Sequence, residues 1–540
     1  MKLKATLLMF VAICHLAVGQ EQEKEPLQSG KFEPTWESLR QYEVPEWFRD
    51  AKFGIWAHWG PQCQPEAGDW YARHMYSEGH GQYNHHTEHY GHPSVFGFKD
   101  VIHEWKAEKW DPEKLVALYK KAGAKYFFAM GNHHDNMDLW DSHYQKWNSV
   151  NLGPKKDILA GWAKAAKENG LPFGVSIHSA HAWRWYETSQ LADKTGDYAG
   201  VPYDGTLTKA DGKGTWWEGL DPQDLYAQNH PLSENSEDLG AIHGQWGWEN
   251  GAVPPSKEYS TNFYNRTVDM INKYEPDLVY FDDTALPLWP VSHVGLEIAA
   301  HYYNKNMLRH DGDLEAVLFG KILTEGQKDA LVWDVERGAP NEIQDQPWQS
   351  CTCLGGWHYD RSVYDRDGYK SAKTVMQMLV DIVSKNGNLL LNVPIRGDGS
   401  IDEKELAVVE DIAKWMEINS ECIYETRPWH VYGEGPKVDN AAPIQAQGFN
   451  EGKGAPYTSK DIRFTKNGDV LYAVVMEWPE NNEEVVVKSL APGSPYYSEN
   501  LNEVEMLGDK LVSYKFDEEG LVVKLPAKKD MDAPLVLKIY

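Results

Sequence analysis

The sequence predicts an α/β fold, in which a (β/α)8-like barrel is followed by a C-terminal all-β sandwich. Between residues 33 and 425, short apolar runs alternate with amphipathic helical patterns, as in chains built on a parallel sheet. Polar side chains stand at the ends of several of these runs, where (β/α)8 barrels carry their active sites. From residue 429 to 540 the helical patterns give way to short strand-like runs separated by turn signals.

The elements of the predicted barrel follow one another along the chain. Apolar runs predict strands at 53–59, 124–131, 172–178, 277–283, 331–338 and 388–393. Apolar residues at helical spacing predict helices at 112–123, 156–170, 262–276, 371–387 and 402–419. Residues 190–260 interrupt this alternation with a segment rich in Gly, Asp and aromatic residues. We expect this segment to be an ordered loop over the active site.

After residue 428 we expect no helix. Runs such as 461–478 and 510–526 read as short strands and contain turn signals such as Asn467-Gly468. This pattern is typical of a β-sandwich.

Composition and charge limit the classes of partner. The chain has 540 residues, of which 41% are hydrophobic and 25% charged, so two or more folded domains are expected. A formal net charge of −28 disfavours nucleic acid as a partner. The 23 Trp and 29 Tyr fit sugar-binding surfaces, because aromatic rings stack on the apolar faces of pyranoses.

The N-terminus has the pattern of a secretory signal peptide over residues 1–19. Lys2 and Lys4 precede an apolar stretch from 5 to 17, and a small-x-small cleavage site stands before Gln20. The apolar stretch is too short to span a membrane, and no later run approaches 18 apolar residues. We therefore expect an exported protein, periplasmic or extracellular, without a membrane span.

Four cysteines remain after residue 19: Cys63, Cys351, Cys353 and Cys422. Their spacing suits neither a zinc site nor a disulfide scaffold, although an oxidising compartment would allow one or two disulfides.

Two carboxylates, Asp282 and Asp283, follow the predicted strand at 277–283. Alone, such a pair is typical of a turn or a helix cap. The ends of four other predicted strands also carry His or carboxylate side chains, however. These are His58, then His133, His134 and Asp135, then His178, and finally Asp334 and Glu336. Since parallel strands end at the same face of a barrel, we expect these side chains to converge on an active site.

Carboxylates on different strands, surrounded by histidines and aromatic rings, suit glycoside hydrolysis. One carboxylate attacks the anomeric carbon, while the other protonates the leaving oxygen. A metal-dependent hydrolase is an alternative, because His133, His134, His178, Asp135 and Asp282 offer zinc ligands. The adjacent histidines would point to opposite faces of a strand, and no HxH or HExxH pattern occurs, which disfavours this alternative.

Residues 33–540 resemble the α-L-fucosidases of glycoside hydrolase family 29. The motifs that carry the resemblance occur in order: PEWFRDAKFGIWAHWG (45–60), GDWYARHMY (68–76), HHDNMDLWDSHYQKWNSVN (133–151), YEPDLVYFDD (274–283) and GNLLLNVPIRGDGSI (387–401). The resemblance implies a (β/α)8-like barrel followed by a β-sandwich, which agrees with the fold predicted from the pattern of strands and helices.

The resemblance also implies roles for particular residues. Asp282 matches the family nucleophile, whereas Asp283 is expected to be a turn or cap residue. His58, His133 and His134 match residues that hold fucose hydroxyls. Trp56 and Trp357 match aromatic residues that pack on the C6 methyl group of the sugar.

Several positions depart from the family pattern. Asp69-Trp70 stands where Glu-Trp is usual, and Tyr280 replaces a common Trp. His178 stands where an aromatic residue is often found, and the motif HHDN replaces the commoner HHDG. These departures suggest a subgroup with a different preference, for example for a sulfated or galacto-configured sugar.

The acid/base has no fixed motif in the family. We predict Glu336, with Glu342 and Asp345 as alternatives, because Gln349 occupies the acid position of the segment that the family shares. The resemblance thus predicts a retaining exo-α-L-fucosidase that acts on fucosylated oligosaccharides or polysaccharides and needs no cofactor or metal. A carbohydrate-binding protein on an inactive barrel is a second alternative, against which the intact Asp282 argues. Oligomeric state is not predicted.

Overall fold

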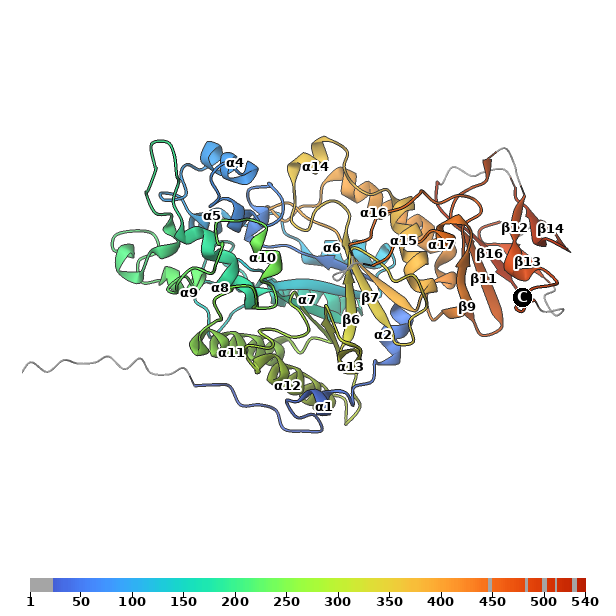
Figure 1. Ribbon diagram of the computed structural model, residues 1–540, viewed down its shortest axis with the longest axis horizontal. Helices are drawn as coiled ribbons and strands as arrows, with labels where there is room; N and C mark the ends of the chain where they lie inside the picture. Colours follow the sequence, from blue (N-terminus) through green and yellow to red (C-terminus); the bar gives the residue numbers. More distant parts are fainter. Residues whose placement is uncertain (1–22, 445–448, 481–483, 498–502, 510–511, 527–531) are drawn as a thin grey trace, which may run out of the picture.

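The computed structural model describes residues 23–540 except 445–448, 481–483, 498–502, 510–511 and 527–531. The expected signal peptide lies outside the described residues. Eight parallel strands, β1 to β8, form a closed barrel in sequence order. Two antiparallel sheets follow at one end of the molecule (Figure 1). The predicted fold class is therefore confirmed.

The barrel strands are short and mostly buried. They are β1 (Phe53–Ala57), β2 (Tyr126–Asn132), β3 (Phe173–Ile177), β4 (Leu278–Phe281), β5 (Val317–Gly320), β6 (Val332–Glu336), β7 (Trp348–Cys353) and β8 (Gly387–Asn392). β1 pairs with both β2 and β8, which closes the barrel. Burial on both faces explains why most of these strands are continuous apolar runs rather than alternating patterns.

Helices surround the barrel. The longer ones are α6 (Pro112–Lys121), α7 (Ile158–Glu168), α11 (Lys257–Tyr274), α12 (Val294–Arg309), α15 (Ala372–Ser384) and α16 (Glu403–Asn419). Side chains at their N-caps fix where several of them begin, because each accepts a hydrogen bond from a free backbone N–H group. Asp111 caps α6, Asp157 caps α7 and Ser371 caps α15. The five helices predicted in the barrel are present; α12 was not predicted.

The segment from residue 190 to 260 connects β3 to α11. It contains the short helices α9 (Pro222–Tyr226) and α10 (Ala241–Gly244), and its Tyr226 and Ile242 are fully buried. In Figure 1 this segment, in green, lies at the end of the barrel away from the C-terminal sheets. The prediction of an ordered loop is confirmed.

The C-terminal region consists of two antiparallel sheets around a common apolar core. The larger sheet has the order β13 (Val504–Met506), β16 (Leu535–Ile539), β11 (Val470–Val475), β10 (Ile462–Asn467) and β9 (Arg427–Glu434). The smaller has the order β12 (Val485–Val487), β15 (Gly520–Lys524) and β14 (Ser513–Asp517). The expectation of no helix was wrong at α17 (Pro436–Asp439), where Pro436 occupies the first helical turn, a position that suits proline.

A buried charge cluster joins the larger sheet to the barrel. Arg463 of β10 donates to Asp381 of α15 (Nε–Oδ1, 2.5 Å), and Lys385 contacts the same carboxylate (Nζ–Oδ2, 2.7 Å). Burial would raise the pKa of Asp381, but Lys385 and Arg463 outweigh it and hold the pKa far below its usual range. The charged carboxylate thereby fixes the sheet against the barrel helix.

All four cysteines of the described chain are free and buried, so none of the disulfides that the cysteine count allowed is formed among them. Cys351 and Cys353 both lie in β7, and Cys63 and Cys422 lie in separate turns of the core. Cys351 donates to Asp334 (3.1 Å) and Cys353 to the carbonyl of Gly355 (3.3 Å), so both thiols are used within the barrel.

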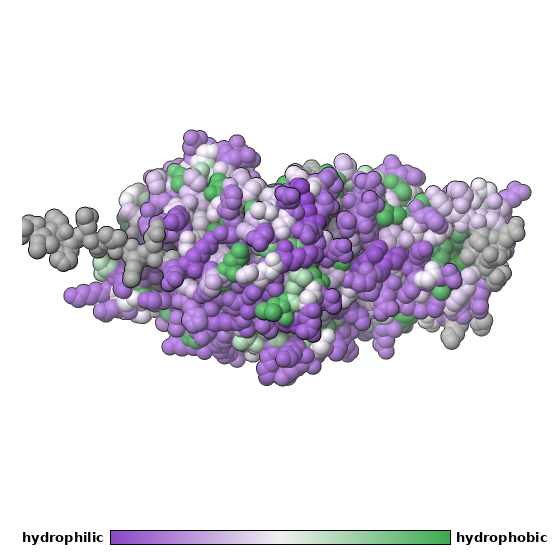
Figure 2. Space-filling model, turned by 90° about the horizontal axis from the view of Figure 1, so that it is seen from below, coloured by the Kyte–Doolittle hydropathy of each residue, from purple (hydrophilic) through white to green (hydrophobic). Residues whose placement is uncertain are grey.

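The face in Figure 2 is mostly hydrophilic, with small and separate hydrophobic patches. None of the helices in the described ranges is long and apolar enough to cross a membrane.

Candidate active site

A pocket of about 590 Å³ opens at the carboxyl ends of the barrel strands. Ten of the eleven predicted site residues line it: Trp56, His58, Asp69, Trp70, His133, His178, Tyr280, Asp282, Glu336 and Trp357. The fold therefore brings together residues that are up to 301 positions apart in the sequence, from Trp56 to Trp357.

The two predicted catalytic carboxylates meet at one lysine. Asp282 follows β4 and Glu336 ends β6, while Lys321 follows β5 between them. Lys321 Nζ lies 2.5 Å from Asp282 Oδ1 and 2.6 Å from Glu336 Oε2. These two oxygens are therefore no more than about 5 Å apart, a separation typical of retaining rather than inverting glycosidases.

The environment of Asp282 keeps it ionised. Burial would raise its pKa, but Lys321 outweighs this effect, and the close approach of His134 and His178 to the carboxylate acts in the same direction. The net result is a pKa well below the usual range. Lys321 in turn keeps its charge, because Asp282 and Glu336 together raise its pKa by more than burial lowers it. A buried, ionised carboxylate in a pocket is equipped to act as a nucleophile.

Replacing Lys321 with methionine removes the charge that most lowers the pKa of Asp282. That pKa should rise, so the ionised fraction of Asp282 at acidic pH should fall. We expect the acidic limb of the kcat/KM–pH profile to move to higher pH, with kcat/KM near neutrality reduced by about 10²-fold. Lys328→Met, on the surface helix α13 (Glu325–Lys328), is the matched control. An unmoved acidic limb would contradict this account of Asp282.

His134 is the predicted site residue that does not line the pocket. It is fully buried, and its Nε2 contacts Asp282 Oδ2 (3.1 Å) while its Nδ1 contacts the carbonyl of His178 (2.7 Å). His178 Nδ1 also approaches Asp282 Oδ2 (3.3 Å). The resemblance implied a contact between His134 and the sugar, whereas the structure places this ring against Asp282.

The turn after β2 explains one departure from the family pattern. Asn136 of the HHDN motif has a φ of 64°, in the left-handed region that glycine and asparagine tolerate. Arg266 donates to its side-chain oxygen (2.6 Å), which fixes the turn. Asparagine can therefore take the place of the commoner glycine without changing the backbone.

Three aromatic rings form an apolar corner of the pocket. Trp56 lies 5.1 Å from Tyr280 and 5.6 Å from Trp357, measured between ring centroids. Asn392, at the end of β8, accepts a hydrogen bond from the His58 backbone N–H group (2.9 Å) and donates to the carbonyl of Trp357 (2.8 Å). Asn392, at the end of the last barrel strand, thus fixes the backbone of His58 and of Trp357 relative to each other.

Two further segments complete the pocket and were not predicted in detail. His243 and Trp246, from the 190–260 segment, stack in line with Trp70 at centroid distances of 5.4 and 6.2 Å. Phe449, from the C-terminal region, also lines the pocket, and its backbone N–H donates to the carbonyl of Glu336 (2.9 Å). The aromatic content of the 190–260 segment indicated the first contribution, but no pattern indicated the second.

Of the other acids considered from the sequence, Asp283 lines the pocket, whereas Glu342 and Asp345 are exposed and do not line it. Of the three candidates for the acid/base, only Glu336 lines the pocket. Asp283 is buried and accepts from the backbone N–H groups of Thr284 (2.7 Å) and Leu288 (3.2 Å), as expected of a turn residue. Gln349 donates to Asp334 (2.9 Å) below the pocket.

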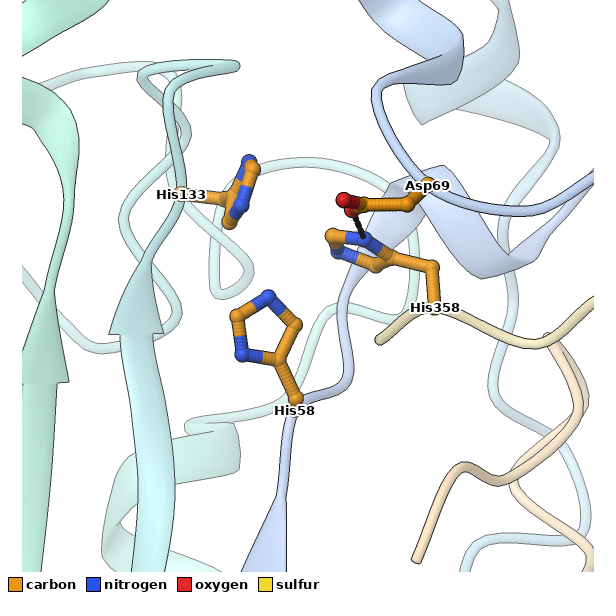
Figure 3. Close-up of side chains that lie close together, drawn as sticks. All are labelled: His58, Asp69, His133 and His358. Atoms are coloured by element: carbon orange, nitrogen blue, oxygen red, sulfur yellow. Dashed lines mark hydrogen bonds and ion pairs between the residues drawn. The ribbon is translucent and has the colours of Figure 1, made fainter. Parts of the chain in front are cut away.

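Two groups of side chains offer metal-ligating atoms within 4.8 Å of one another: His58, Asp69, His133 and His358 (Figure 3), and His133, His134 and His178.

The argument that His133 and His134 point to opposite faces of a strand was wrong. Both follow the last residue of β2, where strand alternation no longer holds, and their rings are 4.4 Å apart. In the first group His358 Nδ1 already bonds Asp69, and His133 Nδ1 bonds Gln62, so neither ring has both nitrogens open.

An aromatic pocket at the carboxyl face of a (β/α)8 barrel, with two carboxylates within about 5 Å, is the active site of a glycoside hydrolase. The sequence model of the α-L-fucosidase family matches residues 19–421, and that of the α-L-fucosidase C-terminal domain matches 455–540. The chain belongs to the α-L-fucosidases, glycoside hydrolase family 29, and is an enzyme of that family.

Similar proteins agree over nearly the whole chain. The α-L-fucosidase of Branchiostoma floridae is 24% identical over 93% of this chain and 94% of its own. The human tissue α-L-fucosidase is 26% identical over 84% of this chain and 79% of its own. The solved α-L-fucosidase of Thermotoga maritima has the same fold, with a TM-score of 0.66, 24% identity and coverage of 94% and 100%. A Bacteroides thetaiotaomicron α-L-fucosidase, solved as a trapped covalent intermediate, has a TM-score of 0.57, 16% identity and coverage of 96% and 99%.

Proposed function

We propose that this chain is a retaining exo-α-L-fucosidase that removes terminal α-L-fucosyl residues from fucosylated oligosaccharides or polysaccharides. The observation that carries the proposal is the separation of about 5 Å or less between the Asp282 and Glu336 oxygens. An inverting enzyme needs room for a water molecule between its carboxyl groups and holds them about 6.5–9.5 Å apart. The covalent intermediate of the B. thetaiotaomicron relative supports the same route.

In the proposed mechanism Asp282 attacks the anomeric carbon and forms a glycosyl ester, while Glu336 gives its proton to the leaving oxygen. Glu336 then takes a proton from water, which attacks the same carbon and frees Asp282. Lys321 and the two histidines that hold the pKa of Asp282 low keep it ionised before the attack. The test is the stereochemistry of the product: NMR during hydrolysis of an aryl α-L-fucoside should show α-L-fucose first. β-L-Fucose as the first product would overturn the retaining assignment.

The aromatic corner should select for the methyl group of fucose. If Trp56 and Trp357 contact C6, a hydroxyl added there would enter an apolar corner without a partner. We expect kcat/KM to favour an aryl α-L-fucoside over the α-L-galactoside by about 1–3 kcal/mol, the usual value of one small group in an apolar pocket. Trp357→Ala should reduce this preference, whereas the exposed Trp216→Ala should not. Equal kcat/KM values for the two substrates would contradict the assignment of fucose.

We also propose that the enzyme is exported after cleavage before Gln20. The support is the charged and apolar pattern of residues 1–19. Mass spectrometry of the protein recovered outside the cytoplasm should find a mature N-terminus near Gln20. Active protein that retains Met1 and stays in the cytoplasm would contradict the proposal.

A further inference from the structure

His358 is a fully buried histidine packed against Asp69, His58 and His133, which line the active-site pocket. One of its ring nitrogens is bonded and the other is not. Its Nδ1 lies 2.7 Å from Asp69 Oδ1. Its Nε2 is buried and has no hydrogen-bond partner within the part of the chain that the structure describes. The ring lies edge-on to those of His58 and His133, each at a centroid distance of 4.7 Å (Figure 3). Leaving a buried polar atom without a hydrogen bond lowers the stability of the folded protein. We therefore expect a bound ligand to supply the missing hydrogen bond.

The neighbours of these rings decide which nitrogens carry a hydrogen. The carboxylate of Asp69 only accepts, so His358 Nδ1 is the donor and Nε2 presents a lone pair. At His133 the bond is reversed: Gln62 Oε1 accepts from the Ala72 N–H group, so its amide nitrogen donates to His133 Nδ1 (2.7 Å). The Nε2 of His133 therefore carries the hydrogen. The neighbouring rings of His358 and His133 thus offer one acceptor and one donor, which suits sugar hydroxyls.

The position of His358 relative to Asp282 indicates which hydroxyl it meets. His178 lies against Asp282 (Nδ1–Oδ2, 3.3 Å) and is 5.0 and 4.8 Å from the rings of His58 and His133. His358 packs against these same two rings, at 4.7 Å from each, and no ring contact joins it to His178 among the described residues. A sugar with its anomeric carbon at Asp282 has C4 across the ring from C1, so its far edge, with the hydroxyls on C3 and C4, would lie toward the group formed by His58, His133 and His358.

We propose that His358 and Asp69 form a dyad in which Asp69 fixes the histidine tautomer and His358 Nε2 accepts a hydrogen bond from the C3 or C4 hydroxyl of the terminal fucose. This inference rests on the proposed function. Asp69 acts on the sugar through His358 and is thus a positioning residue.

The dyad restricts the class of substrate. A sulfate ester at the contacted oxygen has no hydrogen to donate. It would also place a negative charge next to the lone pair of His358 Nε2, whose ring is bonded to the carboxylate of Asp69. The enzyme should therefore reject a fucosyl residue sulfated at that position. On a sulfated glycan, hydrolysis of that sulfate ester must come before removal of the fucose.

The test combines enzyme variants with altered substrates. Wild-type enzyme should lose about 100-fold or more in kcat/KM when either the 3-deoxy or the 4-deoxy aryl α-L-fucoside replaces the parent, because the deoxy sugar leaves Nε2 buried and unpaired. In His358→Ala this ratio should fall to about 10-fold or less for that one substrate. His358→Gln, whose amide oxygen can accept, should keep part of the discrimination. In Asp69→Asn, discrimination should fall without loss of the folded state, because Asn can donate to Nδ1 and so favour the other tautomer.

His89→Gln, an exposed histidine in α4 (Gly81–His89), is the matched control and should leave all ratios unchanged. Uniform loss on every substrate by His358→Ala would mean a merely structural role and would overturn the proposal. So would cleavage of both the 3-O- and 4-O-sulfated aryl fucosides at the rate of the parent. If the wild-type enzyme cleaves no aryl α-L-fucoside, the proposed function itself fails. Calorimetric binding of L-fucose and its 3-deoxy and 4-deoxy forms to wild type and His358→Ala then tests the dyad independently, with equal losses in both proteins overturning it.

Discussion

Replacing Asp282 with alanine is expected to abolish hydrolysis of every α-L-fucoside, with kcat/KM lowered by about 10⁴-fold or more whatever the leaving group. The expected loss follows from the role assigned to Asp282. Without its carboxylate no glycosyl ester forms, and a better leaving group does not replace a missing nucleophile. Azide is small enough to take the vacated space and should attack the anomeric carbon directly. The expected product is β-L-fucosyl azide, identified by NMR.

Asp345→Ala provides the control, because it removes an exposed carboxylate outside the pocket. It should leave kcat/KM unchanged. Substantial activity in Asp282→Ala, without azide, would show that another group attacks the sugar and that the pocket acts by a different mechanism.

Replacing Glu336 with alanine should separate substrates by their leaving groups. Natural glycans have poor leaving groups that need a proton, so their hydrolysis should fall by about 10²–10⁴-fold. Aryl fucosides with activated leaving groups need little protonation, and their first step should survive as a burst of released phenol. The glycosyl ester should then accumulate, because water lacks its general base. Azide needs no base and should release α-L-fucosyl azide, the opposite anomer to that from Asp282→Ala.

The exposed Glu342→Ala is the matched control for this variant and should behave as wild type. If Glu336→Ala cleaves natural glycans at the wild-type rate, Glu336 is not the acid/base, even though it shares Lys321 with Asp282. The same result would leave the assignment of Asp282 untouched, since the two variants test different steps.

The sequence predicted most barrel strands because burial on both faces makes them apolar runs. It did not predict β5 and β7 as strands. β5 has only four residues, and β7 carries Gln349, Ser350 and Thr352. Gln349 and Ser350 are hydrogen-bonded to other barrel segments, and Thr352 is hydrogen-bonded to Glu451 of the C-terminal region. A pattern of apolar residues cannot show pairing that arises only from the tertiary structure.

The same limit applies to the site. Strand ends marked by His and carboxylate residues were found, and the fold brings them to one pocket. Lys321 was missed because its strand was missed, and a lone lysine has no motif. His358 was missed as a site residue because its importance comes from Asp69, 289 positions away in the sequence. The residues that the sequence could not identify have their place in the site because of contacts between segments that are distant in the sequence.

The contribution of Phe449 to the pocket has a consequence for how this enzyme can evolve or be re-engineered. The segment 449–451 makes two backbone hydrogen bonds at the end of β6: the N–H of Phe449 donates to the carbonyl of Glu336, and the N–H of Glu451 donates to that of Arg337, both at 2.9 Å. The C-terminal sheets are thus not an accessory that can be exchanged between family members like a binding module. A catalytic core shortened after residue 425 would keep every barrel strand yet lose Phe449 from the lining of its pocket.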